Sequence, residues 1–286
     1  MMKFKTLVTG SILLGLVATA AAGDIVIATG SEGGGYERIG VSVARNIIVQ
    51  AKKNKLAGVS VEVINTTGSK ENLDLFNEGE VQVALTQADA LAVYPPKVGY
   101  KYKVSHQEAV YWFANKKHKL YNLSDIEGAK DVLMVLVDGS GANVTMENFV
   151  NEDKGYKVNL DTAILADDLE DALDIVATGE YKGKKVAGVL HVTKMGGFSR
   201  ELAQDYKKYI VVGSASDSDF NDAEVGGEPL YRNCEIENSG LGGFSSSNRF
   251  TDNDTVCMNS LVIYNKDAFD NKLSKVVRKG ITKALR

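Results

Sequence analysis

Short apolar runs alternate with segments of helical spacing through the first part of the chain. Three runs are typical of buried strands, at residues 24–28, 59–64 and 81–85. Two segments between them carry apolar residues every three or four positions, at 36–52 and 70–77. The order strand, helix, strand, helix, strand predicts a parallel sheet flanked by helices.

The same alternation returns in looser form further along the chain. Residues 132–137, 160–165 and 186–192 are typical of strands, and 143–150 and 169–178 of helices. This pattern indicates two α/β lobes of similar construction. The chain contains only three prolines and no segment typical of a flexible linker, so we expect the lobes to be joined by strands that cross between them.

Three strand-to-helix turns carry glycine and small polar residues, at 29–36, 66–72 and 138–143. In a parallel α/β sheet such turns emerge at the carboxyl ends of the strands, where ligands bind. A helix N-terminus there presents unpaired backbone N–H groups, which accept a carboxylate or a phosphate. Ser140 either caps the helix that follows it or donates to a ligand, and the pattern favours neither interpretation.

Motifs for catalysis, metal binding or nucleotide binding are missing from the sequence. His106, His118 and His191 lie far apart, without H-E-x-x-H or C-x-x-C spacing. The turn G-x-x-G-x-G at 30–35 differs from the dinucleotide motif G-x-G-x-x-G, and G-x-S-x-G does not occur. The acidic residues at 167–174 are interpreted as a solvated helix face. We therefore expect no enzyme activity, no metal and no cofactor, although an exported enzyme with distant catalytic residues remains an alternative.

The first residues predict export. Lys3 and Lys5 precede an apolar run at 7–17 and the small residues at 18–22, which is typical of a signal peptide cleaved after Ala22 or else after Ala20. An apolar run of about 11 residues is shorter than the ~20 that a membrane-spanning helix needs. The net charge of −4 and the lack of a basic run argue against nucleic-acid binding.

Cys234 and Cys257 are the only cysteines. In an exported protein an isolated pair predicts one disulfide, here closing a loop rich in Gly, Ser and Asn. Two unpaired buried thiols are the alternative.

The turn motifs resemble a known family of receptors. The first block is Ile27-Ala28-Thr29-Gly30-x-x-Gly33-Gly34-x-Tyr36-x-x-x-Gly40, and the second is Thr67-Gly68-Ser69-x-x-Asn72-Leu73-x-Leu75-x-x-x-x-Gly79-x-x-x-x-Ala84-x-x-Gln87-x-Asp89. Together they resemble the TAXI-type solute receptors, the extracytoplasmic binding proteins of one branch of tripartite ATP-independent periplasmic (TRAP) transporters. A third block, Leu123-Ser124-Asp125-Ile126-Glu127-Gly128 followed by Ser140-Gly141, is similar to the entry of this family into its second lobe. The resemblance is strong over residues 24–90 and weaker after about residue 145.

This resemblance implies a type II periplasmic-binding-protein fold, an α/β fold with two lobes and a ligand cleft between them. We expect a signal peptide at 1–22, a first lobe at 23–115, a second lobe at 116–215, and a return to the first lobe at 216–286 that includes the disulfide loop. It also implies a monomeric, periplasmic binding protein that does no chemistry. Such a protein captures a small organic anion or amino acid, glutamate-like or dicarboxylate, and delivers it to the membrane permease subunits of a TRAP transporter.

Matching positions of the family motifs imply a set of ligand contacts from both lobes. The implied contacts are Thr29, Gly35, Tyr36, Thr67, Ser69, Asn72 and Gln87 from the first lobe and Ser140 and Gly141 from the second. The chain departs from the family pattern at Glu32, Glu37 and Ala142. Extra acids near the cleft would favour a ligand that carries an amine, because like charges repel at close range.

Three alternatives to a transport receptor stay open. They are a receptor of the same fold that serves a sensor or another transporter, an exported enzyme, and a surface-adhesion protein. Charged residues that could pair with an anion are Arg38, Lys70, Lys194, Arg200 and Arg249, although each is typical of a solvated surface position.

Overall fold

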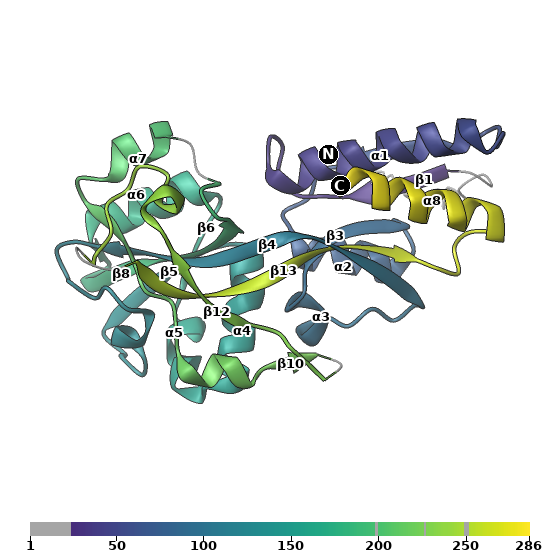
Figure 1. The fold of residues 1–286 in the computed structure, drawn as a ribbon. Helices are drawn as coiled ribbons and strands as arrows, with labels where there is room; N and C mark the ends of the chain where they lie inside the picture. The colour runs from purple at the N-terminus through teal and green to yellow at the C-terminus, as the bar shows by residue number, and fades with distance from the viewer. Residues whose placement is uncertain (1–23, 198–199, 226, 249–251) are drawn as a thin grey trace, which may run out of the picture.

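The computed structural model describes residues 24–197, 200–225, 227–248 and 252–286 (Figure 1). The predicted signal peptide at 1–22 lies outside these residues. The chain forms two α/β lobes, and the long strands β4 and β13 run from one lobe into the other (Figure 1). No helix within the described ranges is both long enough and apolar enough to cross a membrane.

The first lobe is built from the N-terminal part of the chain and its last helix. Its elements are β1 (Asp24–Ala28), α1 (Gly35–Lys53), β2 (Ser60–Ile64), α2 (Ser69–Glu78), β3 (Val83–Gln87), α3 (Ala90–Val93), the first half of β4 (Tyr100–Asn115), the last half of β13 (Asn253–Asn265) and α8 (Asn271–Ala284). β1 pairs in parallel with β2 and β3, and β13 lies antiparallel between β3 and β4. The predicted strand–helix order of residues 24–87 is confirmed.

The second lobe is formed mainly by the part of the chain that lies between β4 and β13 in the sequence. Its helices are the 3₁₀ turns at Leu123–Ile126, Lys154–Tyr156, Ser218–Asp222 and Asn238–Leu241, with α4 (Gly141–Glu152), α5 (Lys157–Asp161), α6 (Leu169–Thr178) and α7 (Arg200–Tyr206). Its strands are β5 (Val132–Val137), β6 (Ile164–Ala166), β7 (Glu180–Tyr181), β8 (Lys184–Lys194), β9 (Ile210–Gly213), β10 (Glu224–Val225), β11 (Glu228–Pro229) and β12 (Arg232–Ile236).

One sheet therefore continues through both lobes in the order β2-β1-β3-β13-β4-β8-β5-β6. Each lobe buries apolar side chains on both faces of its part of this sheet. In the first lobe α1 and α8 cover one face together, and Gly280 lets them approach closely, since a Cβ there would lie 2.8 Å from the backbone of Ile47. α2 and α3 cover the other face, where Phe76 is fully buried.

Two predictions about the second lobe differ from the structure. Residues 157–161 form helix α5, so the predicted strand at 160–165 is reduced to β6. The described residues between 216 and about 256 pack on the second lobe, where Phe220, Tyr231 and Phe244 join its cores. The chain re-enters the first lobe only along β13, at the residues from Ser260 onward that pair with β3. This return is later than the expected boundary at 216.

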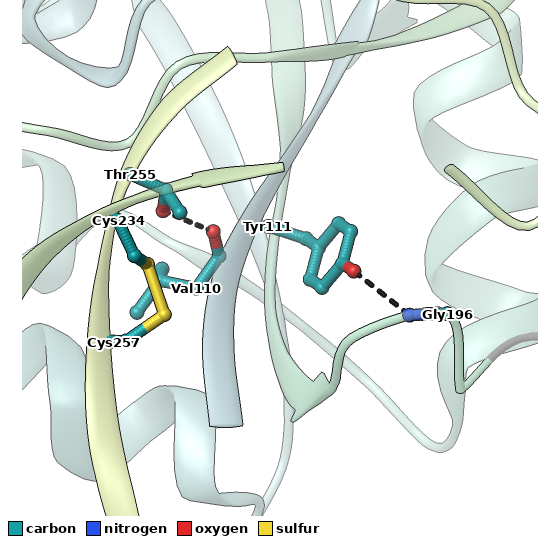
Figure 2. Close-up of a disulfide and its surroundings, with 6 residues drawn as sticks. All are labelled: Val110, Tyr111, Gly196, Cys234, Thr255 and Cys257. Carbon is teal, nitrogen blue, oxygen red and sulfur yellow. Dashed lines mark hydrogen bonds between the residues drawn. A yellow bond between two sulfur atoms is a disulfide. The ribbon is translucent and has the colours of Figure 1, made fainter. Parts of the chain in front are cut away.

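The predicted disulfide is confirmed. Cys234 on β12 is bonded to Cys257 on β13, with an S–S distance of 2.06 Å (Figure 2). β12 pairs only with β13 among the described strands, so the bridge fastens an edge strand to the crossing strand. Beside the bridge, Thr255 Oγ1 donates to the carbonyl oxygen of Val110 on β4 (Figure 2).

Candidate ligand-binding cleft

A cleft of about 800 Å³ lies between the lobes. Residues of both lobes line it, from the turns after β1 and β2 on one side and from the turns after β5, β6 and β8 on the other. Gln87, His106 and Glu108 form its floor, near the point where β3, β13 and β4 run side by side. The cleft therefore occupies the carboxyl ends of the parallel strands, as the turn pattern predicts.

A second hollow of about 710 Å³ lies at β12 near the disulfide. Its lining carries four acids, Asp217, Glu235, Glu237 and Asp254, and no Lys, Arg or His. No strand-to-helix glycine turn opens into it. We place the candidate site in the interlobe cleft, because that hollow combines backbone donors with side chains from both lobes.

Three helices begin at the cleft without a side-chain cap. The N-cap residues of α1, α2 and α4 are Gly34, Gly68 and Ser140, and none of them makes a side-chain cap hydrogen bond. The first N–H groups of a helix have no partner within the helix. Three such ends give this part of the cleft backbone N–H donors and a partial positive charge, an arrangement suited to an anion.

Glycines bring the turns of the two lobes into direct contact here. Gly68 has a φ of 143°, and a Cβ on it would lie 3.3 Å from the carbonyl oxygen of Gly139. A Cβ on Gly141 would overlap the Gln87 side chain. A side chain at Gly68 would be strained at this φ and tight against the second lobe, and one at Gly141 would displace Gln87, which explains why the turns carry glycine.

The floor of the cleft carries a hydrogen-bonded acid. Glu108 on β4 is only 5% exposed. Tyr36 donates its hydroxyl to Glu108 Oε2 at 3.1 Å, and His106 Nε2 lies 3.1 Å from Glu108 Oε1. Burial and the neighbouring Glu108 charge raise the pKa of Tyr36 well above its usual value, so Tyr36 is a neutral donor at pH 7.

The second-lobe wall is more mixed in charge. Burial lowers the pKa of His191 on β8 to about 4, so this imidazole is neutral at pH 7. Lys194 lies opposite Glu108 in the β4–β8 ladder, but its side chain is exposed and forms no ion pair with another described residue. Asp138, Asp167 and Asp168 also line the cleft.

Seven of the nine expected contact residues line this cleft. They are Gly35, Tyr36, Thr67, Ser69, Gln87, Ser140 and Gly141. Thr29 and Asn72 lie behind the wall instead, and both are fully buried. Thr29 Oγ1 donates to the carbonyl oxygen of Ile64, and Asn72 Nδ2 donates to those of Thr29 and Leu85. These two side chains hold the turns in place rather than face the cleft.

Some of the Arg and Lys residues considered as partners for an anion line the cleft, and others do not. Arg38 and Lys194 line the cleft, and Arg38 Nη1 donates to the carbonyl oxygen of Gly33 at 2.7 Å. Lys70 instead pairs with Asp74 on the surface of α2. The side chain of Arg200 and all of Arg249 lie outside the described part of the chain.

The acids that suggested an amine-bearing ligand are not the ones that reach the cleft. Glu37 accepts from the N–H of Gly33 within its own turn, and Glu32 is exposed and does not line the cleft. The acid that does line the cleft floor is Glu108. The sequence does not point to Glu108, because no local pattern predicts β4 as a strand and nothing in the sequence relates this residue to the glycine turns.

The disulfide loop braces one wall of the cleft from behind. The hydroxyl of Tyr111 donates to the carbonyl oxygen of Gly240 in the loop and accepts from the N–H of Gly196, a cleft residue, at 3.2 Å (Figure 2). No described residue between Cys234 and Cys257 lines the cleft itself. The described part of the loop therefore supports the turn after β8 from outside the cleft lining.

Comparisons with known proteins agree with this architecture. A model of the NMT1-like family matches residues 27–157, which is under half of the chain. No curated protein matches the chain. Among solved structures, the GluR0 ligand-binding core in complex with L-glutamate has a TM-score of 0.50 at 12% identity, covering 93% of both chains. The amino acid ABC transporter substrate-binding protein AbpA from Streptococcus pneumoniae, bound to L-arginine, has a TM-score of 0.47 at 12% identity, covering 91% of this chain and 88% of its own.

At these identities the likeness to GluR0 bears on the fold alone. It confirms the predicted type II periplasmic-binding-protein fold, with two α/β lobes and a ligand cleft between them.

Proposed function

We propose that the protein is an exported solute-binding protein that captures a small organic anion or amino acid in the interlobe cleft. One observation carries the proposal. Three helix N-termini without side-chain caps meet at a single cleft between two lobes. Such ends bind carboxylates well, and a cleft between two lobes joined by two strands can close on a solute.

The ligand contacts follow from this arrangement. The backbone N–H groups at Gly35, Ser69 and Gly141 would receive a carboxylate, since they begin the three helices. Thr67, Ser140, Tyr36 and Gln87 would orient the solute through their side chains, because they line the same cleft. The Ser140 hydroxyl is buried and has no partner among the described residues, which favours a ligand contact over a cap.

The motif resemblance supports a particular partner. The blocks at 27–40 and 67–89 resemble TAXI-type receptors, so we propose that the loaded protein docks on the permease subunits of a TRAP transporter in the periplasm. The family model over 27–157 and the GluR0 core, which was solved with L-glutamate, are consistent with a receptor for small solutes. A receptor for a sensor or another transporter would use the same cleft.

An enzyme is the second candidate, and one observation favours it. Ser105 Oγ lies 3.1 Å from His106 Nδ1, and His106 Nε2 lies 3.1 Å from Glu108. A hydroxyl, an imidazole and a carboxylate are linked in turn, as in a hydrolase triad, but the serine lies at Nδ1 and the acid at Nε2, the reverse of the triad arrangement. Ser105 does not line the cleft, however, so its hydroxyl would not meet a solute bound there. We therefore interpret the chain Ser105–His106–Glu108 as support for the cleft floor.

A thermal-shift screen tests both candidates. The mature protein is unfolded, freed of any bound solute and refolded, and then screened against amino acids, dicarboxylates and 2-oxoacids. A ligand at a hundredfold excess over its Kd raises stability by about 2.7 kcal/mol. We expect a stabilising compound that is recovered unchanged. Conversion of that compound, abolished by Ser105→Ala, would establish the enzyme instead.

A further inference from the structure

We propose that Glu108 forms a cation subsite in the cleft floor that binds a protonated amine of the solute. The solute is then a zwitterion, with a carboxylate at the helix N-termini and an ammonium group at Glu108. This inference rests on the proposed function, because it assigns the ligand chemistry of the same cleft.

The first support is the incomplete set of partners around Glu108. Its carboxylate is 5% exposed and has one contact on each oxygen, from Tyr36 and from His106. Two carboxylate oxygens offer about four acceptor sites, so about half of them are unused. Within the described chain no Lys or Arg forms an ion pair with Glu108. His106 is the one described side chain that can pair with it, and only when its imidazole is protonated. A buried carboxylate whose charge is not fully balanced is costly.

Unused acceptors near Glu108 are the second support. Gln87 Oε1 is buried and receives no hydrogen bond from a described residue, and neither does the hydroxyl of Ser260. Gln87, Ser260 and His106 occupy directly paired positions on β3, β13 and β4, so their side chains lie on the same face of the sheet. Glu108 lies two residues beyond His106 and therefore shares that face.

These acceptors select for a donor group. A primary ammonium has three N–H donors and no acceptor, so it can supply hydrogen bonds to Glu108 and Gln87 while it neutralises the carboxylate. A dicarboxylate without an amine brings only acceptors and a like charge. It would leave the floor unsatisfied and would be repelled by Glu108.

The position of the subsite fits the rest of the cleft. The hydroxyl of Tyr36, in the first turn of α1, donates to Glu108, so the acid lies next to one of the helix N-termini that would hold the carboxylate. Lys194, directly opposite Glu108 on β8 and exposed, is placed to meet a second carboxylate of the solute. Glu108 and Lys194 therefore present opposite charges to one small molecule, although three acids of the second-lobe wall, Asp138, Asp167 and Asp168, line the same cleft.

Matched ligand pairs test this assignment. L-glutamate and glutarate carry the same two carboxylates and differ only in the amine. L-arginine and 5-guanidinopentanoate, and L-leucine and 4-methylpentanoate, differ in the same way. Isothermal titration calorimetry at pH 7 on the refolded mature protein would give the affinity ratio within each pair. We expect the amine-bearing member of the pair that binds to be favoured by at least about tenfold, because loss of a hydrogen bond to a charged group has an effect of this order.

Glu108→Gln should reduce that ratio to within about threefold, chiefly by weakening the amine-bearing ligand. Glu108→Asp keeps the charge and should retain most of the preference. Glu235→Gln, in the hollow beside the disulfide, is the matched control and should change neither affinity. Folding of each variant is checked by its thermal transition.

Two results would overturn the assignment while leaving the proposed receptor intact. One is equal binding of both members of a pair by the unmodified protein. The other is an unchanged affinity ratio between the amine-bearing and amine-free ligands in Glu108→Gln. That result would mean that the ligand amine does not contact Glu108 and that His106 is the partner of this acid. Binding of no member of any pair would overturn the receptor proposal and this inference together.

Discussion

The two lobes face each other at the cleft and also at α3 and α4. Several polar groups of the described cleft residues lack partners, whereas most of those at α3 and α4 are hydrogen-bonded. In the cleft, three helix ends lack side-chain caps, and buried acceptors such as Gln87 Oε1 have no donor among the described residues. Around α3 and α4 the polar groups are paired across the lobes. We call the second group the α3–α4 contact, and it consists of Asp89, Tyr94, Thr145, Glu147, Asn148 and Tyr231.

The α3–α4 contact is centred on Asp89, which begins α3 and is fully buried. Asp89 Oδ2 accepts from Thr145 Oγ1 at 2.6 Å and from the Tyr231 hydroxyl at 3.0 Å, while Asn148 Nδ2 donates to its carbonyl oxygen. Tyr94 donates to Glu147 at its edge. Among the fully buried side-chain oxygens and nitrogens of these described residues, only Asp89 Oδ1 is left without a partner.

This difference indicates that the α3–α4 contact serves stability and the cleft serves ligand binding. The α3–α4 contact makes most of its hydrogen bonds within the protein and therefore contributes to stability without a solute. The cleft leaves donors and acceptors unfilled, which costs stability and is expected where a ligand completes the structure. Changes in the contact should alter stability, and changes in the cleft should alter binding.

The largest expected effect concerns the buried charge of Asp89. Burial raises the pKa of Asp89 to about 7, from an ordinary value of 3.8. The folded protein therefore holds a proton that the unfolded chain has released between pH 4 and pH 7, so stability falls as the pH rises through this range. The loss amounts to about 4 kcal/mol by pH 8. Asp89→Asn keeps an acceptor for Thr145 and Tyr231 without the charge, and should be more stable than the unmodified protein at pH 8.

Urea unfolding at pH 5 and pH 8 measures this difference. His191 has the opposite effect on the pH dependence, because its lowered pKa makes stability rise between pH 4 and pH 6.5. This effect is the same in the unmodified protein and in Asp89→Asn, so it cancels in their comparison. The advantage of Asp89→Asn should be small at pH 5 and large at pH 8. An advantage of the same size at both pH values would contradict a titrating Asp89.

The next largest effect is expected from a substitution that adds a side-chain cap to α4 at the cleft. At α8, which lies away from the cleft, Asp270 accepts from the N–H groups of Lys272 and Leu273. Ser140→Asp would place the same cap and a negative charge at the start of α4. We expect stability to rise by roughly 0.5 kcal/mol, but a carboxylate ligand should bind at least about tenfold more weakly because its N–H donors are occupied.

Calorimetric titration and thermal unfolding of the same sample separate these two effects. The matched control is Asp270→Ala, which should cost about 1 kcal/mol of stability and leave ligand affinity unchanged. Unchanged affinity in Ser140→Asp would remove α4 from the ligand site.

The smallest expected effect lies at the edge of the α3–α4 contact. Tyr94→Phe removes the hydroxyl that donates to both oxygens of Glu147, at 2.9 and 2.8 Å. Since both residues are partly exposed, we expect a loss of about 1 kcal/mol in urea unfolding. Ligand affinity should change by less than about twofold. A large loss of affinity would show that the contact and the cleft are coupled.

Local patterns predicted the first lobe well because its strands and helices follow each other with short turns. Residues 24–87 have the expected order, and seven expected contact residues line one cleft. Thr29 and Asn72 belong to the same turns but point inward, a difference of side-chain direction that a motif does not contain. Their hydrogen bonds to Ile64 and Leu85 depend on strands that lie elsewhere in the sequence.

The crossing strands show where sequence patterns are insufficient. β4 combines a first half at Tyr100–Gln107 that is exposed or half-buried with a fully buried second half at Ala109–Ala114, so neither alternation nor a single apolar run marks its full length. Its partners β13 and β8 are far away in the chain. The position of Glu108, at the junction of these halves, follows only from that pairing.

Native mass spectrometry of the refolded mature protein, incubated with an equimolar mixture of amino acids and organic acids, tests the central claim most directly. We expect one equivalent of a small carboxylate bound to the unmodified protein and released unchanged on denaturation, and a much smaller bound fraction in Ser140→Asp. Failure of the unmodified protein to retain any component, or equal retention by Ser140→Asp, would contradict a carboxylate held at the helix N-termini of the cleft.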